Sequence, residues 1–287
     1  MKQETILNLF SQHRLKDSTL EFLESLKFLK YQMETPEKFE LISYVNSSPN
    51  IVKKIFESYY ESGFCETFKL ETSECKNLMY KYFEETNQNR KSTRKFSSTP
   101  LSFNLLSDFL NIFYSITGKE EVELKSGKIY RKKRNIASGG SLYPTEIYIV
   151  NNKVDKLPLG VFRYNVYNFE LELIKNFNLD ENKKLFNEVM MNSENNTTSI
   201  DYENTSFFII FSSVLNKHSF KYQDFGIALS LIEIGEFIHS AYLSSSVLDI
   251  GCCAYGGFLN NKMGELLEIS NPLHLPLICM AVGNKNL

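Results

Sequence analysis

The chain has 287 residues, which is enough for one large domain or for one domain with a smaller appendage. Apolar residues make up 43% and charged residues 23% of the chain, and the net charge of −2 gives no reason to expect nucleic acid as a partner. No secretory signal and no run approaching about 18 apolar residues is readable, so we expect a cytoplasmic protein that does not span a membrane.

The first part of the chain has the pattern of a helical appendage. No glycine occurs before Gly63, and a broken apolar stripe suits a packed helix. The stripe consists of Leu20, Phe22, Leu23, Leu26 and Leu29. We predict a mainly helical N-terminal extension over residues 1–85 and a second domain over residues 86–287, with the polar residues 84–98 as the connection.

The second domain is predicted to combine long helices with strands in an irregular order. Helices are expected at residues 101–117, with Gly118 as the stop, and at 179–191 and 225–243. Strands are expected at 146–151, in a hairpin over 161–174, at 206–214 and at 276–283, and a polar loop at 193–198. Because strands and helices do not alternate regularly, the pattern favours an α+β fold over a doubly wound sheet.

Residues 90–96 (RKSTRKF) have the composition of an anion-binding segment. We call Arg90, Ser92 and Arg94 the phosphate clamp, because each guanidinium offers a planar fork of donors that matches phosphate oxygens. A solvated basic stretch is the alternative interpretation.

A second segment, residues 138–144 (SGGSLYP), is called the ring loop. Its paired glycines would let the backbone approach a flat ligand closely, although a plain turn before a strand is the alternative. A phosphate site and a planar-ring site together describe flavin mononucleotide, FMN.

These segments, in this order, resemble the nitroreductase-like flavoproteins over residues 89–283. Within them the chain is similar to the azoline dehydrogenases of ribosomal peptide maturation, as in streptolysin and microcin. The resemblance implies an antiparallel sheet flanked by helices, FMN as cofactor, and a homodimer with the flavin between subunits. It places cofactor contacts on residues from four segments. These are Arg90, Ser92 and Arg94, then Ser138, Gly139, Gly140, Ser141 and Tyr143, then Gly251 and Cys252, and finally Lys285.

The resemblance also selects a catalytic pair, Lys221 and Tyr222, just before the expected helix at 225–243. The dipeptide has no value by itself, since Lys-Tyr also occurs at residues 30–31 and 81–82. Lys221 could act as a base if burial favours its neutral amine, and Tyr222 could orient the ring or relay the proton. A surface lysine beside a half-buried aromatic residue is the alternative. Residues 251–257 (GCCAYGG) resemble a glycine-rich turn over the flavin.

The implied reaction is the two-electron oxidation of a peptide thiazoline or oxazoline to the aromatic azole. Its expected partners are a precursor peptide and an ATP-dependent cyclodehydratase complex. Two other hypotheses stay open. The first keeps the flavin and changes the reaction, to an NAD(P)H-dependent nitro- or quinone-reductase or to an oxidase of carrier-bound azolines. The second is a flavin-bound scaffold subunit of a cyclodehydratase complex.

The cysteines and histidines do not predict a metal or a disulfide framework. Five cysteines are irregularly spaced, and none pairs with a histidine at zinc spacing. Cys252 and Cys253 are adjacent, which is poor geometry for a mutual disulfide, so we interpret them as packing residues. Tyr130, Arg131 and Arg134 form a basic stretch that could meet a peptide or simply solvate a loop.

Overall fold

The computed structural model describes residues 15–27, 44, 47–56, 68–70, 77–190 and 200–286. The chain divides into two units, one of residues 1–28 and 84–287 and one of residues 29–83. The smaller unit contains α5 (Pro49–Phe56) and the start of α6 (Leu78–Asn89), which continues into the larger unit. The domain boundary predicted at residue 85 stays a prediction.

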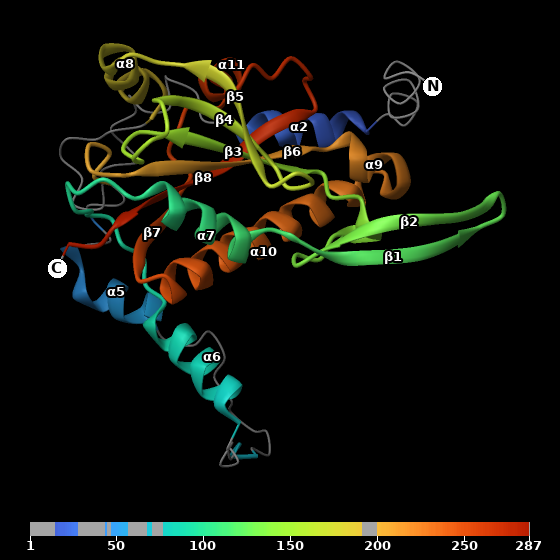
Figure 1. The fold of residues 1–287 in the computed structure, drawn as a ribbon, viewed down its shortest axis with the longest axis horizontal. Coiled ribbons are helices and arrows are strands. Elements are labelled where there is room, and N and C mark those ends of the chain that lie inside the picture. The colour runs from blue at the N-terminus through green and yellow to red at the C-terminus, as the bar shows by residue number, and fades with distance from the viewer. Residues whose placement is uncertain are drawn as a thin grey trace. The chain divides into compact units, whose positions relative to one another are not determined.

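The larger unit is built on a six-stranded antiparallel sheet (Figure 1). Its strands lie in the order β5-β4-β3-β6-β8-β7, so neighbours in space are often distant in sequence. The strands are β3 (Thr145–Asn151), β4 (Gly160–Asn165), β5 (Glu170–Asn176), β6 (Phe207–Val214), β7 (Ile250–Tyr255) and β8 (His274–Asn284).

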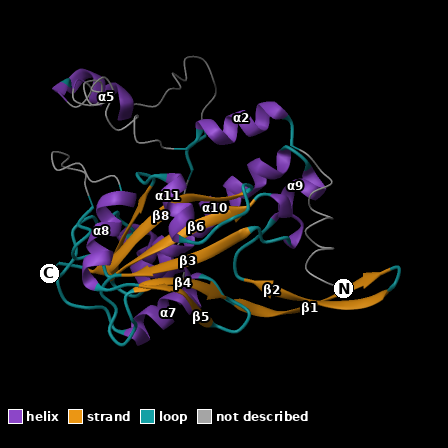
Figure 2. Ribbon diagram, turned by 90° about the horizontal axis from the view of Figure 1, so that it is seen from above, coloured by secondary structure: helices purple, strands orange, loops and turns teal. Residues whose placement is uncertain are grey.

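Helices cover both faces of this sheet (Figures 1 and 2). The helices α7 (Phe103–Phe113) and α10 (Phe225–Val247) pack on one face, and α8 (Leu179–Val189) and α11 (Asn260–Leu266) on the other. Alternate residues of β6 therefore enter two different cores, which explains its continuous apolar sequence. The short α9 (Asn216–Tyr222) leads into α10. Asp224, which lies between α9 and α10, is contacted by α2 (Asp17–Ser25), because Thr19 Oγ1 donates to the Asp224 carboxylate at 2.7 Å.

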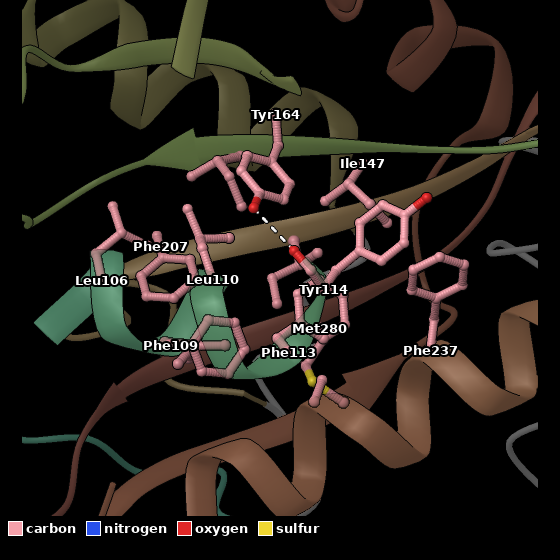
Figure 3. Close-up of a cluster of buried hydrophobic side chains, with 14 of the residues drawn as sticks. Leu106, Phe109, Leu110, Phe113, Tyr114, Ile147, Tyr164, Phe207, Phe237 and Met280 are labelled. Atoms are coloured by element: carbon pink, nitrogen blue, oxygen red, sulfur yellow. Dashed lines mark hydrogen bonds between the residues drawn. The ribbon is translucent and has the colours of Figure 1, made fainter. Parts of the chain in front are cut away.

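The core beneath α7 is dominated by aromatic rings (Figure 3). Tyr114 lies edge-on to Phe237 of α10, with ring centres 4.7 Å apart, and the hydroxyl of Tyr164 donates to the carbonyl of Tyr114 at 2.8 Å. Full burial of such a ring stabilises the fold by about 1.5–3 kcal/mol. The core therefore fixes the end of α7 against α10.

A two-stranded hairpin extends from this body (Figure 1). It consists of β1 (Ile116–Leu124) and β2 (Gly127–Arg134), and we call it the hairpin arm. Charged pairs cross between the two strands, with Arg131 Nη2 2.7 Å from Glu120 and Lys128 Nζ 2.6 Å from Glu121. The second strand leads directly into the ring loop.

The α+β fold with an antiparallel sheet flanked by helices is confirmed. The strands predicted at 146–151, 161–174, 206–214 and 276–283 and the helices at 179–191 and 225–243 are confirmed where the structure describes them. The helical N-terminal extension is described only at α2, α5 and α6, and the loop 193–198 and Leu29 lie outside the described residues.

Three predictions of local structure were wrong. The helix at 101–117 ends at Phe113, because the Asn135 side chain caps the carbonyls of Ile112 and Phe113 at 2.9 and 3.2 Å, and Gly118 lies inside β1. The segment 251–257 is mostly strand β7, paired with β8, rather than a turn. Of the stripe in α2, only one described residue, Leu23, is buried.

Helix α10 is long and apolar enough to cross a bilayer by length and composition. Its packing in the sheet domain accounts for this composition, because it contacts α7, α9, β3 and β7. A core helix passes the same test as a membrane span, so the helix is weak evidence for a membrane.

Candidate functional site

The phosphate clamp runs along the β7 edge of the sheet and is anchored by its backbone. The amide of Thr93 donates to the carbonyl of Cys252 at 2.8 Å, and the amide of Asp201 donates to the carbonyl of Arg94 at 2.9 Å. Phe96, which is 2% exposed, fills the core below. These contacts fix the backbone on which the clamp side chains lie.

All three clamp side chains are exposed, and two of them are organised by Tyr242 of α10. The Arg90 guanidinium carbon lies 5.0 Å from the centre of the Tyr242 ring, and Ser92 Oγ lies 3.0 Å from its hydroxyl. Within the described part of the chain, neither Arg90 nor Arg94 has a carboxylate within 4.0 Å. The clamp thus holds two guanidinium groups available for an external anion. Tyr242 had no signal in the sequence beyond an apolar helical position.

Gly251 and Cys252 lie under the clamp. A Cβ on Gly251 would come within 2.7 Å of Thr93 Cγ2, so only glycine lets the clamp segment lie this close to β7. The Cys252 side chain is 2% exposed, and burial raises the pKa of its thiol to about 11. Cys252, Cys253 and Cys279 are free and buried, which confirms the packing interpretation for the first two. Flavin contacts by Gly251 and Cys252 stay predictions.

Lys285 lies beside the clamp segment but already has a counter-ion. Its Nζ is 2.5 Å from the carboxylate of Asp249, and this lysine holds the pKa of Asp249 below its usual value. Its backbone forms an isolated β-bridge with Phe96. The structure therefore brings Lys285 to the clamp, with its charge neutralised by Asp249.

The ring loop is a tight turn with three residues in left-handed backbone conformation. Gly140 has φ 64°, Ser141 has φ 55° and Tyr143 has φ 47°. The Ser138 side chain holds the turn, since the amide of Tyr143 donates to its Oγ at 2.8 Å. Each non-glycine residue in this conformation costs about 1–3 kcal/mol, and such strain is concentrated at functional sites.

The predicted catalytic pair meets the ring loop. A Cβ built on Gly140 would lie 2.8 Å from the Tyr222 hydroxyl and 3.0 Å from Lys221 Nζ. The two polar groups therefore converge on one glycine of the loop, although they come from another element, α9. Lys221 is exposed in this chain. Burial of this lysine, which is the condition for its use as a base, would therefore have to come from a ligand or a second subunit.

A buried histidine ties α9 to the ring loop. His218 is fully buried, with Nε2 3.2 Å from the carbonyl of Gly139 and Nδ1 3.0 Å from Ser230 Oγ. Ser230 Oγ in turn donates to the carbonyl of Gly226 at 3.0 Å, and burial lowers the pKa of His218. Glu233 of α10 lies behind it, with Oε2 4.0 Å from His218 Nε2 and Oε1 accepting from the Thr145 amide at 3.2 Å. Burial raises the pKa of Glu233.

The clamp and the ring loop lie near opposite ends of α10. Leu229 packs against Gly139, whereas Tyr242 contacts Arg90 and Ser92. At about 1.5 Å per residue, these two positions on the helix are roughly 20 Å apart. A single chain therefore presents two half-sites, one with the clamp and one with the ring loop and the Lys221–Tyr222 pair.

Arg134 flanks the ring loop on the side of Tyr143. Its guanidinium carbon lies 4.0 Å from the centre of the Tyr143 ring, and it donates to the hydroxyls of Tyr114 and Tyr167, the latter at 2.5 Å. A cavity of about 420 Å³ opens here, lined by these four residues together with others from β3, β4 and α9. In the sequence, Arg134 was left without an assigned role.

No group of three or more histidine, cysteine or acidic residues that could hold a metal occurs in the described part of the chain. The polar groups of the two half-sites instead suit an anion and a planar ligand.

Known proteins similar to this chain include two named as nitroreductases and one chain of a microcin synthetase complex. A protein of Methanocaldococcus jannaschii named as a nitroreductase is 26% identical over 196 residues, which cover 68% of this chain and 87% of that protein. A solved structure from Ralstonia eutropha, also named as a nitroreductase, has 19% identity and a TM-score of 0.52, covering 71% of this chain and 83% of that chain. A chain of the Escherichia coli microcin synthetase McbBCD complex, solved with truncated pro-MccB17 bound, has 17% identity and a TM-score of 0.54. That match covers 91% of this chain and 99% of the other.

The two structural likenesses show a shared fold. The sequence pattern of the Nitroreductase family matches residues 88–284, a range that includes every residue of the clamp, the ring loop and the Lys221–Tyr222 pair. Because this match spans most of the chain, the protein belongs to the Nitroreductase family of flavin oxidoreductases.

Proposed function

We propose that the protein is an FMN-dependent dehydrogenase that oxidises peptide thiazolines or oxazolines to the aromatic azoles. The observation that carries this proposal is the convergence of Lys221 Nζ and the Tyr222 hydroxyl on Gly140 of the ring loop. Azoline oxidation needs a base beside a flavin face, and this geometry supplies a base candidate at the predicted ring-binding position.

The residues of both half-sites fit FMN. Arg90 and Arg94 offer guanidinium groups without a described carboxylate partner, and Ser92 adds a hydroxyl, which together suit a phosphate. At the ring loop, the missing Cβ of Gly140 lets the Tyr222 hydroxyl and Lys221 Nζ come close to the backbone, so two polar groups lie at the predicted ring position. When bound, the flavin would supply the acceptor for the hydride that leaves Cβ of the azoline.

We further propose a homodimer in which the clamp of one subunit completes the ring loop of the other. The separation of roughly 20 Å along α10 supports this arrangement. The exposed residues of α10 also include large apolar side chains, with Phe225 63% and Ile232 58% exposed. Such a surface on a long helix suits contact with a second protein surface.

In this mechanism Lys221 takes the proton from Cα of the azoline while the Cβ hydride leaves for the flavin. The Tyr222 hydroxyl orients the azoline or passes on the proton. A bound substrate and a second subunit would exclude water from the exposed Lys221 and favour its neutral form. Two hydrogens leave the ring as a proton and a hydride, and molecular oxygen is proposed to reoxidise the flavin.

The fold likeness to a chain of the microcin synthetase complex supports a peptide substrate and a cyclodehydratase complex as partners. That likeness covers 91% of this chain and so reaches beyond the residues matched by the family pattern. The alternative is an NAD(P)H-dependent reductase, which the nitroreductase name of the Methanocaldococcus jannaschii relative favours.

The test is azole formation by purified, FMN-loaded protein on a synthetic thiazoline peptide, read as the loss of two hydrogen atoms by mass spectrometry. Lys221→Ala and Tyr222→Phe are expected to keep bound flavin and to lose at least about 100-fold in rate. Lys81→Ala, at an exposed Lys-Tyr dipeptide in α6, is the matched control and keeps the wild-type rate. Full azole formation by both active-site variants would refute the catalytic roles, while flavin reduction by NADPH without azole formation would favour the reductase.

A further inference from the structure

The cavity beside Arg134 is separate from the position where Lys221 and Tyr222 meet the loop. We call it the Arg134 pocket, and its walls include Tyr114, Arg134, Tyr143, Glu146, Tyr167 and Lys217. Its volume of about 420 Å³ falls in the range of small-ligand sites. Ser141 and Tyr143 of the ring loop form one wall, so the pocket begins one residue beyond Gly140. A ligand lying over the ring loop could therefore extend directly into it.

The charges that line the pocket do not balance. Lys217 is paired with Glu146 at 3.1 Å, and Arg163 is paired with Glu172 at 2.7 Å. Arg134, by contrast, has no carboxylate within 4.0 Å among the residues that the structure describes. Its contacts are uncharged tyrosine hydroxyls and rings, and its Nε is buried without a hydrogen-bond partner. One guanidinium charge is thus held at the pocket without a counter-ion.

Neighbouring groups do not supply the missing charge. Glu233 lies near Arg134, but it forms no ion pair with it within 4.0 Å, and its Oε1 accepts from the Thr145 amide at 3.2 Å. On the outer side, Lys132 adds a further positive charge, since its Nζ donates to the carbonyl of Tyr167 at 3.2 Å and lies 5.0 Å from that ring. The outer side of the pocket therefore carries two cationic side chains, Arg134 and Lys132, that have no ion pair within 4.0 Å among the described residues.

We infer that the Arg134 pocket binds a carboxylate of the peptide substrate, from an acidic residue next to the azoline. This inference rests on the proposed function for its substrate class. A half-buried guanidinium without a counter-ion is costly in the free protein, and a ligand carboxylate would relieve that cost with charge-assisted hydrogen bonds. The planar fork of arginine, stacked on Tyr143, matches a carboxylate better than a lysine would.

The test measures binding rather than turnover, so that it stands even if azole formation fails. Two fluorescent thiazoline peptides, which differ only in Glu or Gln beside the ring, are titrated onto FMN-loaded protein and followed by anisotropy. Wild type is expected to bind the Glu peptide about tenfold or more tightly than the Gln peptide. In Arg134→Gln this preference disappears, and in Arg134→Lys it is reduced.

Arg131→Gln is the matched control, because it removes the same charge from the same strand at a residue already paired with Glu120. Flavin content and melting temperature show whether each variant is folded, and the two-peptide comparison in wild type does not depend on any variant. Equal binding of the two peptides by wild type, or an unchanged preference in Arg134→Gln, would overturn the inference. The same variant is also titrated with NADPH and NADH. If Arg134→Gln weakened NADPH binding but left NADH binding and the peptide preference unchanged, the pocket would be assigned to a nucleotide phosphate, and the inference would be overturned.

Discussion

His218 Nε2 lies 3.2 Å from the carbonyl oxygen of Gly139, and this contact ties the helix that carries Lys221 and Tyr222 to the ring loop. Lys217 of the same helix makes a second tie, because its Nζ donates to the carbonyl of Tyr143 at 3.2 Å. The histidine is fully buried and does not reach the surface where a substrate would lie. Its effect on catalysis would therefore be to position the pair.

Replacing this histidine is expected to weaken both the fold and the site. His218→Ala removes bonds to Gly139 and Ser230 and leaves a cavity, so the free energy of unfolding should fall by about 2–4 kcal/mol. Urea denaturation measures this change. His239→Ala, at an exposed position of α10, is the control and should change stability by less than about 0.5 kcal/mol. Equal losses of unfolding free energy in the two variants would contradict the structural role of His218.

Gly140→Ala tests the meeting point of the loop and the catalytic pair. The new Cβ would overlap the Tyr222 hydroxyl at 2.8 Å and would sit at φ 64°, so the pair must move and the backbone is strained by about 1–2 kcal/mol. A shift of about 1 Å can lower a rate by about 100-fold, which a peptide oxidation assay would detect. Gly264→Ala in α11, where the added Cβ meets nothing within 4 Å, should instead be stabilising by about 0.5–1 kcal/mol.

The clamp can be tested through flavin binding alone. Arg90→Gln and Arg94→Gln should each weaken FMN binding by about 10- to 100-fold, because each removes charge-assisted hydrogen bonds to a phosphate. Equilibrium titration of the apoprotein with FMN, followed by flavin fluorescence, measures the change. Lys95→Gln removes an exposed charge from the same segment and should bind FMN as wild type does. If riboflavin, which lacks the phosphate, were affected as strongly as FMN, the assignment of the clamp to the phosphate would be wrong.

We predict that protonation of His274 lowers the free energy of unfolding in mild acid. Burial lowers the pKa of His274 to about 4, below its unfolded value near 6.5, and its Nε2 lies 2.9 Å from Ser212 Oγ. The unfolded chain therefore binds the proton first, and this residue lowers stability as the pH falls below about 6.5, with the full effect reached below about 4. The total contribution is about 3 kcal/mol.

His274→Gln should remove that contribution. The difference in unfolding free energy between pH 7 and pH 4.5 is expected to be smaller in the variant than in wild type, as measured by urea denaturation at each pH. An identical pH dependence in the two proteins would show that His274 does not titrate in this way.

The parts of the fold that follow from local pattern were predictable, and those that depend on distant contacts were not. Strand β6 and helix α10 are long apolar segments, and their patterns predicted them correctly. The hairpin arm was not predicted, because its acidic first strand and basic second strand resemble a solvated loop. The end of α7 was misplaced because Asn135, from beyond the arm, caps it.

The candidate site likewise contains residues that the sequence pattern could indicate and residues that it could not. The order of motifs selected Lys221 and Tyr222, and the structure brings both to the ring loop. The sequence could not indicate that Tyr242 would organise Arg90 and Ser92, since a tyrosine on an apolar helical stripe is indistinguishable from a core residue. Nor could it show that Lys285 is neutralised by Asp249, a residue on a different element.

Helix α10 has a consequence for the proposed dimer. Glu233 lies beneath the ring loop, and Tyr242 contacts the clamp residue Ser92, so the same helix positions residues of two different cofactor sites. A displacement of α10 along its axis would alter both sites together. The two flavins of a dimer would then be coupled, so that filling or reducing one changes the affinity or potential of the other.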